Sequence, residues 1–297
     1  MYEDIKKNKI KTGLIVLIFL TMISVIIYFL CYTFDLSEYA LIFALGFSII
    51  STILTYYNCD KVVLASVRAR PATREEDLKL TNILDALMIS SGLPVKPKLY
   101  VIDSMQANAF ATGRNPENSI ICVTKGLLEK LDYYELEGVI AHEMSHIKNY
   151  DIRLSAVVSV MVGFVIMLSD VFTRSMFFRR GSRDKDSGKG NAILMIIGLV
   201  FLIFSPIASK LIQLAVSRRR EYLADATAVS FTRNPDGLIS ALKKLSGDSD
   251  ELDTASNSSA HMYIVTPFKN KKESNVKNLF STHPDTADRI KALENLK

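Results

Sequence analysis

Tryptophan is absent from the 297-residue sequence, and cysteine and histidine are scarce, with three and four residues. The cysteines form no CxxC pair and are too few for a disulfide framework, so we interpret Cys31, Cys59 and Cys122 as small buried hydrophobic residues. The net charge is only +5. Because the basic residues gather at the ends of apolar runs rather than in one long block, no nucleic-acid partner is expected.

Charge is missing altogether from two long stretches near the N-terminus, residues 12–34 and 39–59. Each stretch is long enough to cross a hydrocarbon core of roughly 30 Å as a helix. A cleaved signal peptide fits poorly, because the first run is too long, no A-x-A-like site follows it and a second run comes at once. Residues 1–60 are therefore predicted to form a retained transmembrane hairpin.

Basic residues flank this hairpin on one side only. They precede the first run and follow the second, whereas the connecting turn at residues 35–38 has none: Lys6, Lys7, Lys9, Lys11, Lys61, Arg68 and Arg70. By the positive-inside rule, the N-terminus and the chain just after residue 60 are predicted to be cytoplasmic.

A second apolar pair lies in the middle of the chain, at residues 154–169 and 190–209. Six basic residues lie between the two runs, within residues 174–189. If both runs cross the bilayer, this loop lies outside, against the positive-inside rule; if they enter without crossing, it stays inside. Crossing is slightly favoured because the second run is long. In both cases residue 218 returns to the side of the membrane that holds residues 61–153.

The remaining sequence is typical of a soluble domain that is mainly α with a small β-sheet. A capping box at Thr73 and Glu76 predicts a helix that ends near Gly92, and a second box at Asp132 and Glu135 predicts another. Between them, three strand-like segments are predicted at residues 98–103, 107–112 and 119–124, with a turn at 113–116 and a short helix at 125–130. Three further helices are predicted: one through residues 221–232, one at 238–245 and one after Pro284.

The second capped helix carries the sequence HEMSH, an HExxH pattern formed by His142, Glu143 and His146. Histidines four residues apart lie on one face of a helix, so both can bind one zinc ion. The glutamate beside the first histidine can deprotonate a water molecule. A catalytic zinc site of this kind usually takes a third protein ligand.

Four residues compete for the role of third ligand. Asp151 is close in sequence but lies off the histidine face, while His261 and His283 lie far along the chain. Glu221 is the best candidate, because Asp225 follows at i+4 and could accept a hydrogen bond from a ligand histidine. Taken alone, the two acids could equally be an exposed face after three arginines. A metzincin arrangement is excluded, because Asn149 and Ile152 stand where its glycine and third histidine would be.

The combination of HEMSH with Asn149 and Asp151, followed by EYLAD at residues 221–225, resembles the HtpX-type membrane zinc endopeptidases, which are relatives of the CAAX prenyl endopeptidases. Residues 108–111 and 281–284 resemble two further motifs of that family. The resemblance implies an integral-membrane, zincin-like (gluzincin-type) metallopeptidase with transmembrane helices. Its catalytic domain would be split into residues 61–153 and 218–297 by an apolar hairpin at 154–217.

The resemblance also implies roles for individual residues. One Zn²⁺ per chain would be held by His142, His146 and Glu221; Glu143 would be the general base, Asp225 would orient a ligand histidine, and His283 would donate a hydrogen bond in catalysis. Asn108, Ala109 and Phe110 would belong to an edge strand that binds substrate. The alternatives are that His283 is an ordinary helix-start residue and that residues 108–111 form an ordinary core strand.

The implied activity is cleavage of membrane or misfolded polypeptides from the cytoplasmic side of the plasma (inner) membrane, in protein quality control or a stress response. The partners would be polypeptide substrates and the lipid bilayer, and oligomerisation stays open. The main alternative is a non-catalytic membrane scaffold with a vestigial zinc site. A small transporter is disfavoured, because residues 12–34 and 39–59 contain no ionisable group for a translocation path.

Overall fold

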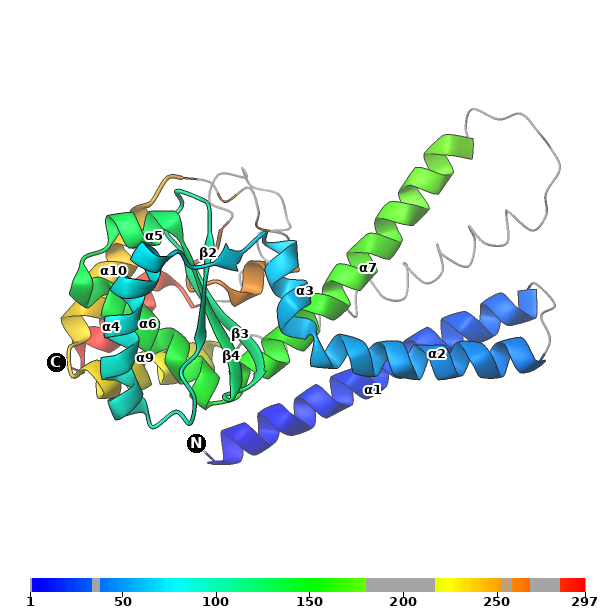
Figure 1. Cartoon of the computed structure of the whole chain (residues 1–297), viewed down its shortest axis with the longest axis horizontal. Coiled ribbons are helices and arrows are strands. Elements are labelled where there is room, and N and C mark those ends of the chain that lie inside the picture. The colour runs from blue at the N-terminus through cyan, green and yellow to red at the C-terminus, as the bar shows by residue number, and fades with distance from the viewer. Residues whose placement is uncertain are drawn as a thin grey trace.

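The computed structural model describes residues 2–33, 38–179, 217–250, 252, 255, 258–267 and 284–296. Three long helices extend from one side of a globular body: α1 (Tyr2–Thr33), α2 (Glu38–Tyr57) and α7 (Asp151–Arg179) (Figure 1). The predicted basic loop from residue 180 onward and the apolar run at 190–209 lie outside the described residues.

Two predicted capping boxes fix the starts of the two central helices of the body. The Thr73 hydroxyl accepts a hydrogen bond from the Glu76 amide and begins α4 (Arg74–Ser91), which ends at Gly92 with a left-handed φ of 65°. Asp132 and Glu135 make the same reciprocal pair at the start of α6 (Tyr133–Lys148). Each box satisfies amide groups that the first turn of a helix leaves without partners.

A four-stranded mixed sheet packs beside these helices, in the order β1-β2-β4-β3. The parallel pair is β2 (Lys98–Ile102) with β4 (Asn118–Thr124), while β1 (Arg70–Pro71) and β3 (Ala109–Asn115) pair antiparallel with their neighbours. The three predicted strands are confirmed, and the two-residue β1 was not anticipated. Because β3 ends the strand order, its outer side is an edge of the sheet.

The sequence predicts a turn at residues 113–116, but β3 continues to Asn115 and the turn lies at residues 116–117. The register shifts between Gly113 and Asn115, which marks a bulge. Gly113 has a φ of 141°, and a Cβ there would lie 2.3 Å from the carbonyl oxygen of Asn118. Glycine therefore permits a close strand approach here instead of ending the strand.

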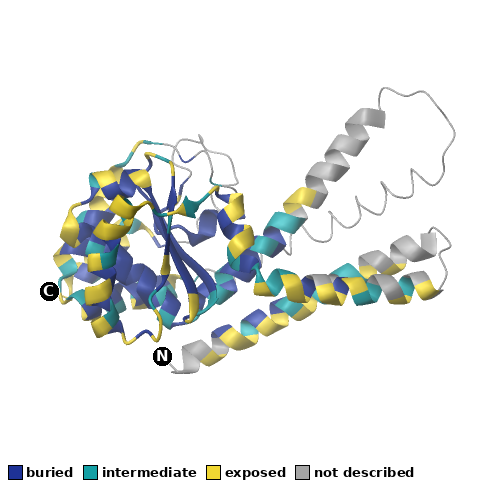
Figure 2. Cartoon of the chain, in the orientation of Figure 1, coloured by how far each residue is buried: buried dark blue, intermediate teal, exposed yellow. Residues whose placement is uncertain are grey.

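Helix α6 lies at the centre of the body, where it contacts β3, α4, α9 (Arg218–Thr232) and α10 (Pro235–Gly247). Helix α4 contributes four residues at helical spacing to this same buried core: Leu80, Ile83, Leu84 and Leu87. Short elements surround it, namely α3 (Cys59–Ser66), α5 (Lys125–Lys130), η1 (Ala260–Met262) and α12 (Thr286–Glu294). Figure 2 shows the buried residues concentrated between these helices and the sheet.

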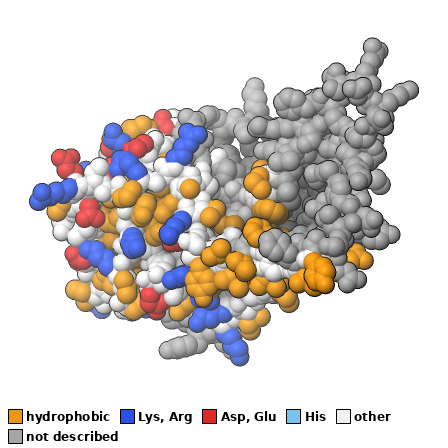
Figure 3. Space-filling view, turned by 45° about the vertical axis from the view of Figure 1, so that its right-hand side comes forward, with side chains coloured by type: hydrophobic (Ala, Val, Ile, Leu, Met, Phe, Trp, Pro, Cys, Tyr) orange, Lys and Arg blue, Asp and Glu red, His pale blue; other side chains and the backbone are white. Residues whose placement is uncertain are grey.

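Helices α1 and α2 expose many large apolar side chains, and orange side chains gather over this part of the surface in Figure 3. The exposed residues include Leu14, Leu17, Ile49, Ile50, Ile53 and Leu54. Among the described residues, one helical stretch is both long and apolar enough to span a bilayer, Asn8–Val25, with a mean hydropathy of 1.6. The apolar stretch of α2, Leu45–Tyr57, is shorter. Ile15 and Phe19 of α1 pack against Leu154 and Val158 of α7 and tie the hairpin to the body.

The close packing of α6 on α10 gives a test of the fold at Gly138. A Cβ at Gly138 would lie 2.8 Å from the Leu238 backbone nitrogen, so Gly138→Ala must push the two helices apart. We expect a loss of about 1–3 kcal/mol in the free energy of unfolding, seen as a lower thermal midpoint. Gly46→Ala is the matched control, because no heavy atom lies within 4 Å of its new Cβ. Equal midpoints for both variants would contradict this packing.

Candidate active site

One turn of α6 places His142 and His146 side by side, as their i, i+4 spacing predicts. Their Nε2 atoms are 3.2 Å apart and their ring centroids 4.7 Å apart. His142 is almost wholly buried and His146 is only slightly more accessible. Two largely buried imidazoles with their Nε2 atoms this close can offer both atoms to a single metal ion.

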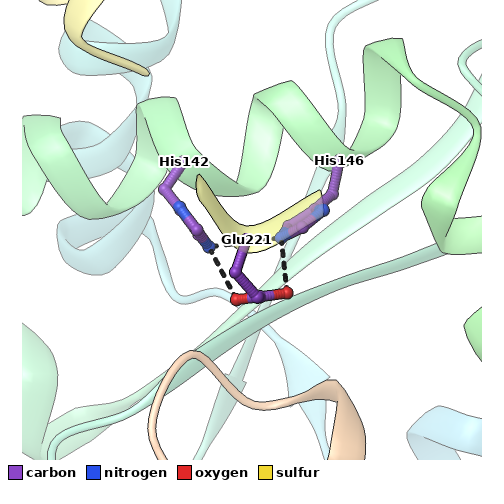
Figure 4. Close-up of side chains that lie close together, drawn as sticks. All are labelled: His142, His146 and Glu221. Atoms are coloured by element: carbon purple, nitrogen blue, oxygen red, sulfur yellow. Dashed lines mark hydrogen bonds and ion pairs between the residues drawn. The ribbon is translucent and has the colours of Figure 1, made fainter. Parts of the chain in front are cut away.

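Helix α9 brings the Glu221 carboxylate close to both Nε2 atoms (Figure 4). Its oxygens lie 3.8 Å from His142 Nε2 and 3.7 Å from His146 Nε2. Ligand atoms about 2.1 Å from a tetrahedral zinc ion lie roughly 3.4 Å from one another. The Nε2–Nε2 distance and the shortest distance from each Nε2 to a Glu221 oxygen are close to that value, and one donor atom from each residue lies within 4.8 Å of the others. The two histidines and Glu221 therefore fit a single zinc ion.

A carboxylate holds the other nitrogen of each histidine ring. His142 Nδ1 lies 2.9 Å from Asp225 Oδ1, and His146 Nδ1 lies 2.9 Å from Asp151 Oδ2. If each Nδ1–H donates to its carboxylate, both Nε2 atoms are left as acceptors for a metal ion. The structure places Asp225 where the sequence predicted it. Asp151 is not one of the metal donors but holds the ring of His146 instead.

The position of Asp151 follows from how α6 ends. Asn149 caps α6, and Tyr150 adopts a left-handed φ of 61° before α7 begins at Asp151. This turn brings Asp151 back against His146, although it would lie off the histidine face on a continuous helix. A non-glycine residue in this conformation costs about 1 kcal/mol or more, which the contacts of Asp151 must offset.

Arg289 of α12 neutralises the carboxylate of Asp225, and no sequence motif points to this arginine. It is 1% exposed, donates to both oxygens of Asp225 at 2.8 and 2.6 Å, and also donates to the Ile264 carbonyl. Burial alone would raise the pKa of Asp225, but Arg289 and His142 lower it below its usual value, so Asp225 stays ionised. The nearby Arg289 Nη2 and His142 Nδ1, 3.4 Å apart, make no good hydrogen bond, since both are donors in this arrangement.

Asp151 is held by residues from three parts of the chain. Arg220 of α9 donates to its Oδ1 at 3.2 Å, while His146 occupies Oδ2. The amide nitrogen of Asn8, in α1, donates to Oδ1 at 2.7 Å and to the Asn149 carbonyl at 3.2 Å. Asn8 is buried, and both of its N–H bonds are used. A single sequence carries no signal for this contact across more than 140 residues.

A cavity lies at the metal site and is lined by the two histidines, Glu221 and Glu143. Glu143 is buried beside the three donor residues. Burial raises the pKa of Glu143, and the neighbouring charge of Glu221 raises it further. His146, the Ala111 backbone and Arg289 lower it, and the pKa of Glu143 is about 7. A carboxylate with a pKa near neutrality can both accept and return a proton at physiological pH.

The other predicted site residues lie near the cavity or outside the described chain. Ala111 lines the cavity, whereas Asn108, Ala109 and Phe110 are buried in or beside β3. His261 also lines it, 3.3 Å from the Ser155 carbonyl, but is not one of the three residues whose donor atoms meet. His283 lies outside the described residues.

An HExxH helix completed by a carboxylate from a later helix defines the metal centre of a metallopeptidase. Comparison with known sequences agrees with this class. Residues 74–297 match Peptidase family M48. A relative from Dictyoglomus thermophilum named "Protease HtpX homolog" is 43% identical over 296 residues, covering 98% of this chain and 93% of the relative. One from Listeria monocytogenes with the same name is 42% identical over 308 residues, covering both chains fully.

The chain therefore belongs to peptidase family M48 and is an HtpX-type membrane metalloprotease. Among solved structures, the crystal structure of Ste24p from S. mikatae aligns with 95% of this chain and 62% of that one, with 19% identity and a TM-score of 0.49.

The contact between α1 and Asp151 predicts that Asn8 affects metal affinity. Asn8→Ala leaves the buried Asp151 with one donor fewer, so Asp151 holds the His146 ring less firmly. Partners of ligand histidines are typically worth roughly 10–100-fold in affinity, and Asn8 acts one step further out, so we expect a zinc affinity weakened by about 3–10-fold. Competition with a chromophoric chelator on the full chain in detergent measures this.

Thr21→Ala is the matched control for this prediction. Thr21 lies exposed on the same helix, and its hydroxyl donates to the Leu17 carbonyl of that helix. It should bind zinc like the unmodified protein. In an Asp151→Ala background, Asn8→Ala should add little, because the two residues act through one contact. Full additivity of the two substitutions would contradict the coupling.

The charges around His146 predict that metal affinity depends on pH. Burial lowers the pKa of His146, but Asp151, Glu221 and Glu143 outweigh this effect and raise it to about 9. The imidazolium form cannot bind metal, so binding below this pKa must release a proton. We expect zinc affinity to rise about ten-fold per pH unit from roughly pH 6 to 8. Calorimetry in buffers of different ionisation enthalpy counts the proton; an affinity that does not change over this range would contradict the assignment.

Proposed function

We propose that this chain is a membrane-embedded, zinc-dependent endopeptidase that hydrolyses peptide bonds of membrane or misfolded proteins from the cytoplasmic side. The observation that carries the proposal is the meeting of His142, His146 and Glu221 beside the buried Glu143. Family membership supports the class of reaction, and the basic residues that flank the apolar run of α1 support the cytoplasmic orientation.

Each residue of the site has a chemical task in this proposal. The two histidines and Glu221 hold zinc, which when bound supplies the Lewis acidity that makes water a competent nucleophile at neutral pH. Glu143 accepts a proton from the attacking water and returns it to the leaving amine. Asp225 and Asp151 fix the histidine rings through Nδ1. His283 is proposed as a hydrogen-bond donor to the developing oxyanion.

The substrate backbone is proposed to bind as an extended strand along the outer edge of β3. The Ala109 carbonyl already accepts a hydrogen bond from the Ile264 amide, and the Asn108 side chain donates to the Val265 carbonyl. Backbone groups two residues apart in a strand face the same edge, so the backbone of Ala111 faces the same side as that of Ala109. Ala111 and Glu143 line the same cavity. An extended peptide added at Ala111 would therefore lie beside the general base.

Two substitutions separate the roles of the carboxylates. Glu143→Gln removes the proton acceptor but leaves all three metal donors, so we expect zinc affinity within a few-fold of normal and a loss of cleavage of at least about 10³-fold. Glu221→Gln removes a donor and should weaken both. The assay is cleavage of casein by the zinc-loaded full chain, with and without chelator. A wild-type protein that binds zinc but cleaves no faster than Glu143→Gln would favour the scaffold alternative.

A further inference from the structure

A cavity of about 310 Å³ lies outside the metal site, where α1, α2 and the start of α7 meet. Nine residues line it: Lys9, Thr12, Gly13, Val16, Thr52, Ile53, Tyr56, Tyr57 and Arg153. Two of these residues are cationic and none is acidic. Nothing in the proposed peptidase reaction uses this cavity.

The two cations are gathered around one aromatic ring. Lys9 Nζ lies 4.3 Å from the ring centroid of Tyr150, and the Arg153 guanidinium carbon lies 5.6 Å from the same centroid. Among the described residues, no carboxylate lies within 4.0 Å of either charge. Cation–π contacts of this kind are worth about 0.5–1 kcal/mol each. Arg153 also donates through Nε to the Arg114 carbonyl at 2.6 Å, but neither this bond nor the ring contacts supply a negative charge. The pair thus presents a positive site to an anion.

The surroundings of the cavity are divided between polar and apolar groups. Lys9 lies just before the uncharged stretch that begins after Lys11, while Val16 and Ile53 form an apolar wall further along the two helices. Ile53 is 51% exposed and is one of the exposed apolar side chains of α1 and α2. Tyr56 and Tyr57 lie at the same level as the cations, where tyrosine is favoured at a membrane surface. An occupant that matches this division has an anionic head and an apolar tail.

We propose that this cavity binds one anionic phospholipid, with its phosphate between Lys9 and Arg153 and its acyl chains along Val16 and Ile53. Basic pockets between membrane helices on the cytoplasmic side are suited to such headgroups. The proposal needs α1 and α2 to lie in the bilayer, but it does not depend on zinc or on peptidase activity. Because Asn8 precedes Lys9 in α1, a bound lipid would also hold the part of α1 that reaches Asp151.

Lipid retention by the full chain tests this proposal. The protein is placed in nanodiscs of phosphatidylcholine in which about one lipid in five is phosphatidylglycerol. It is then released from the nanodiscs for native mass spectrometry. We expect one phosphatidylglycerol to remain bound in preference to phosphatidylcholine. Lys9→Gln should lower its retention about five-fold, and Lys9→Arg should restore it. Arg153→Gln should act in the same direction.

Lys6→Gln is the matched control, because Lys6 is exposed on the same helix, carries the same charge and does not line the cavity. It should leave retention unchanged. An equal loss with Lys6→Gln would show general surface attraction and overturn the site. Equal retention of phosphatidylcholine would overturn the preference for an anion. Displacement of the lipid by soluble glycerophosphate would show that the cavity takes a free phosphate ester and would overturn the lipid assignment.

Discussion

Each histidine of the HExxH helix is held at Nδ1 by a buried carboxylate, and the rest of the site depends on these two hydrogen bonds. His142 is held by Asp225 and His146 by Asp151, each at 2.9 Å. They fix the tautomer and the direction of each ring, so that both Nε2 atoms face Glu221. Without them, the i, i+4 spacing would bring the rings close together but would not orient their lone pairs.

The two carboxylates are themselves buried charges, and the fold supplies a compensating group for each. Arg289 forms a bidentate pair with Asp225, while Arg220 and Asn8 donate to Asp151. Leaving a buried charge without its partner costs roughly 3–5 kcal/mol. Since these partners come from α12, α9 and α1, elements far apart in the sequence supply charge compensation at the metal site. Helix α1 thus takes part in assembling the site.

Local patterns explain which elements and residues could be predicted from sequence. Both capping boxes, the strands at residues 98–102 and 118–124, and the pairing of Glu221 with Asp225 involve residues at most a few positions apart. The role of Asp151 was missed because it depends on the left-handed turn at Tyr150, which no helical pattern includes. Gly113 was taken for a turn residue, although the structure uses it in a bulge within β3.

The sequence by itself determined the HExxH helix, its predicted third donor, the uncharged runs near the N-terminus and the mainly helical class with a small sheet, because helix periodicity, capping and charge patterning act over short distances. Only the tertiary structure decided which charge compensates which. Asn8 reaches Asp151 and Arg289 reaches Asp225 across 143 and 64 positions in the chain. Such contacts follow from how helices pack around a shared core, and a buried charge accepts whichever donor that packing brings within hydrogen-bond distance.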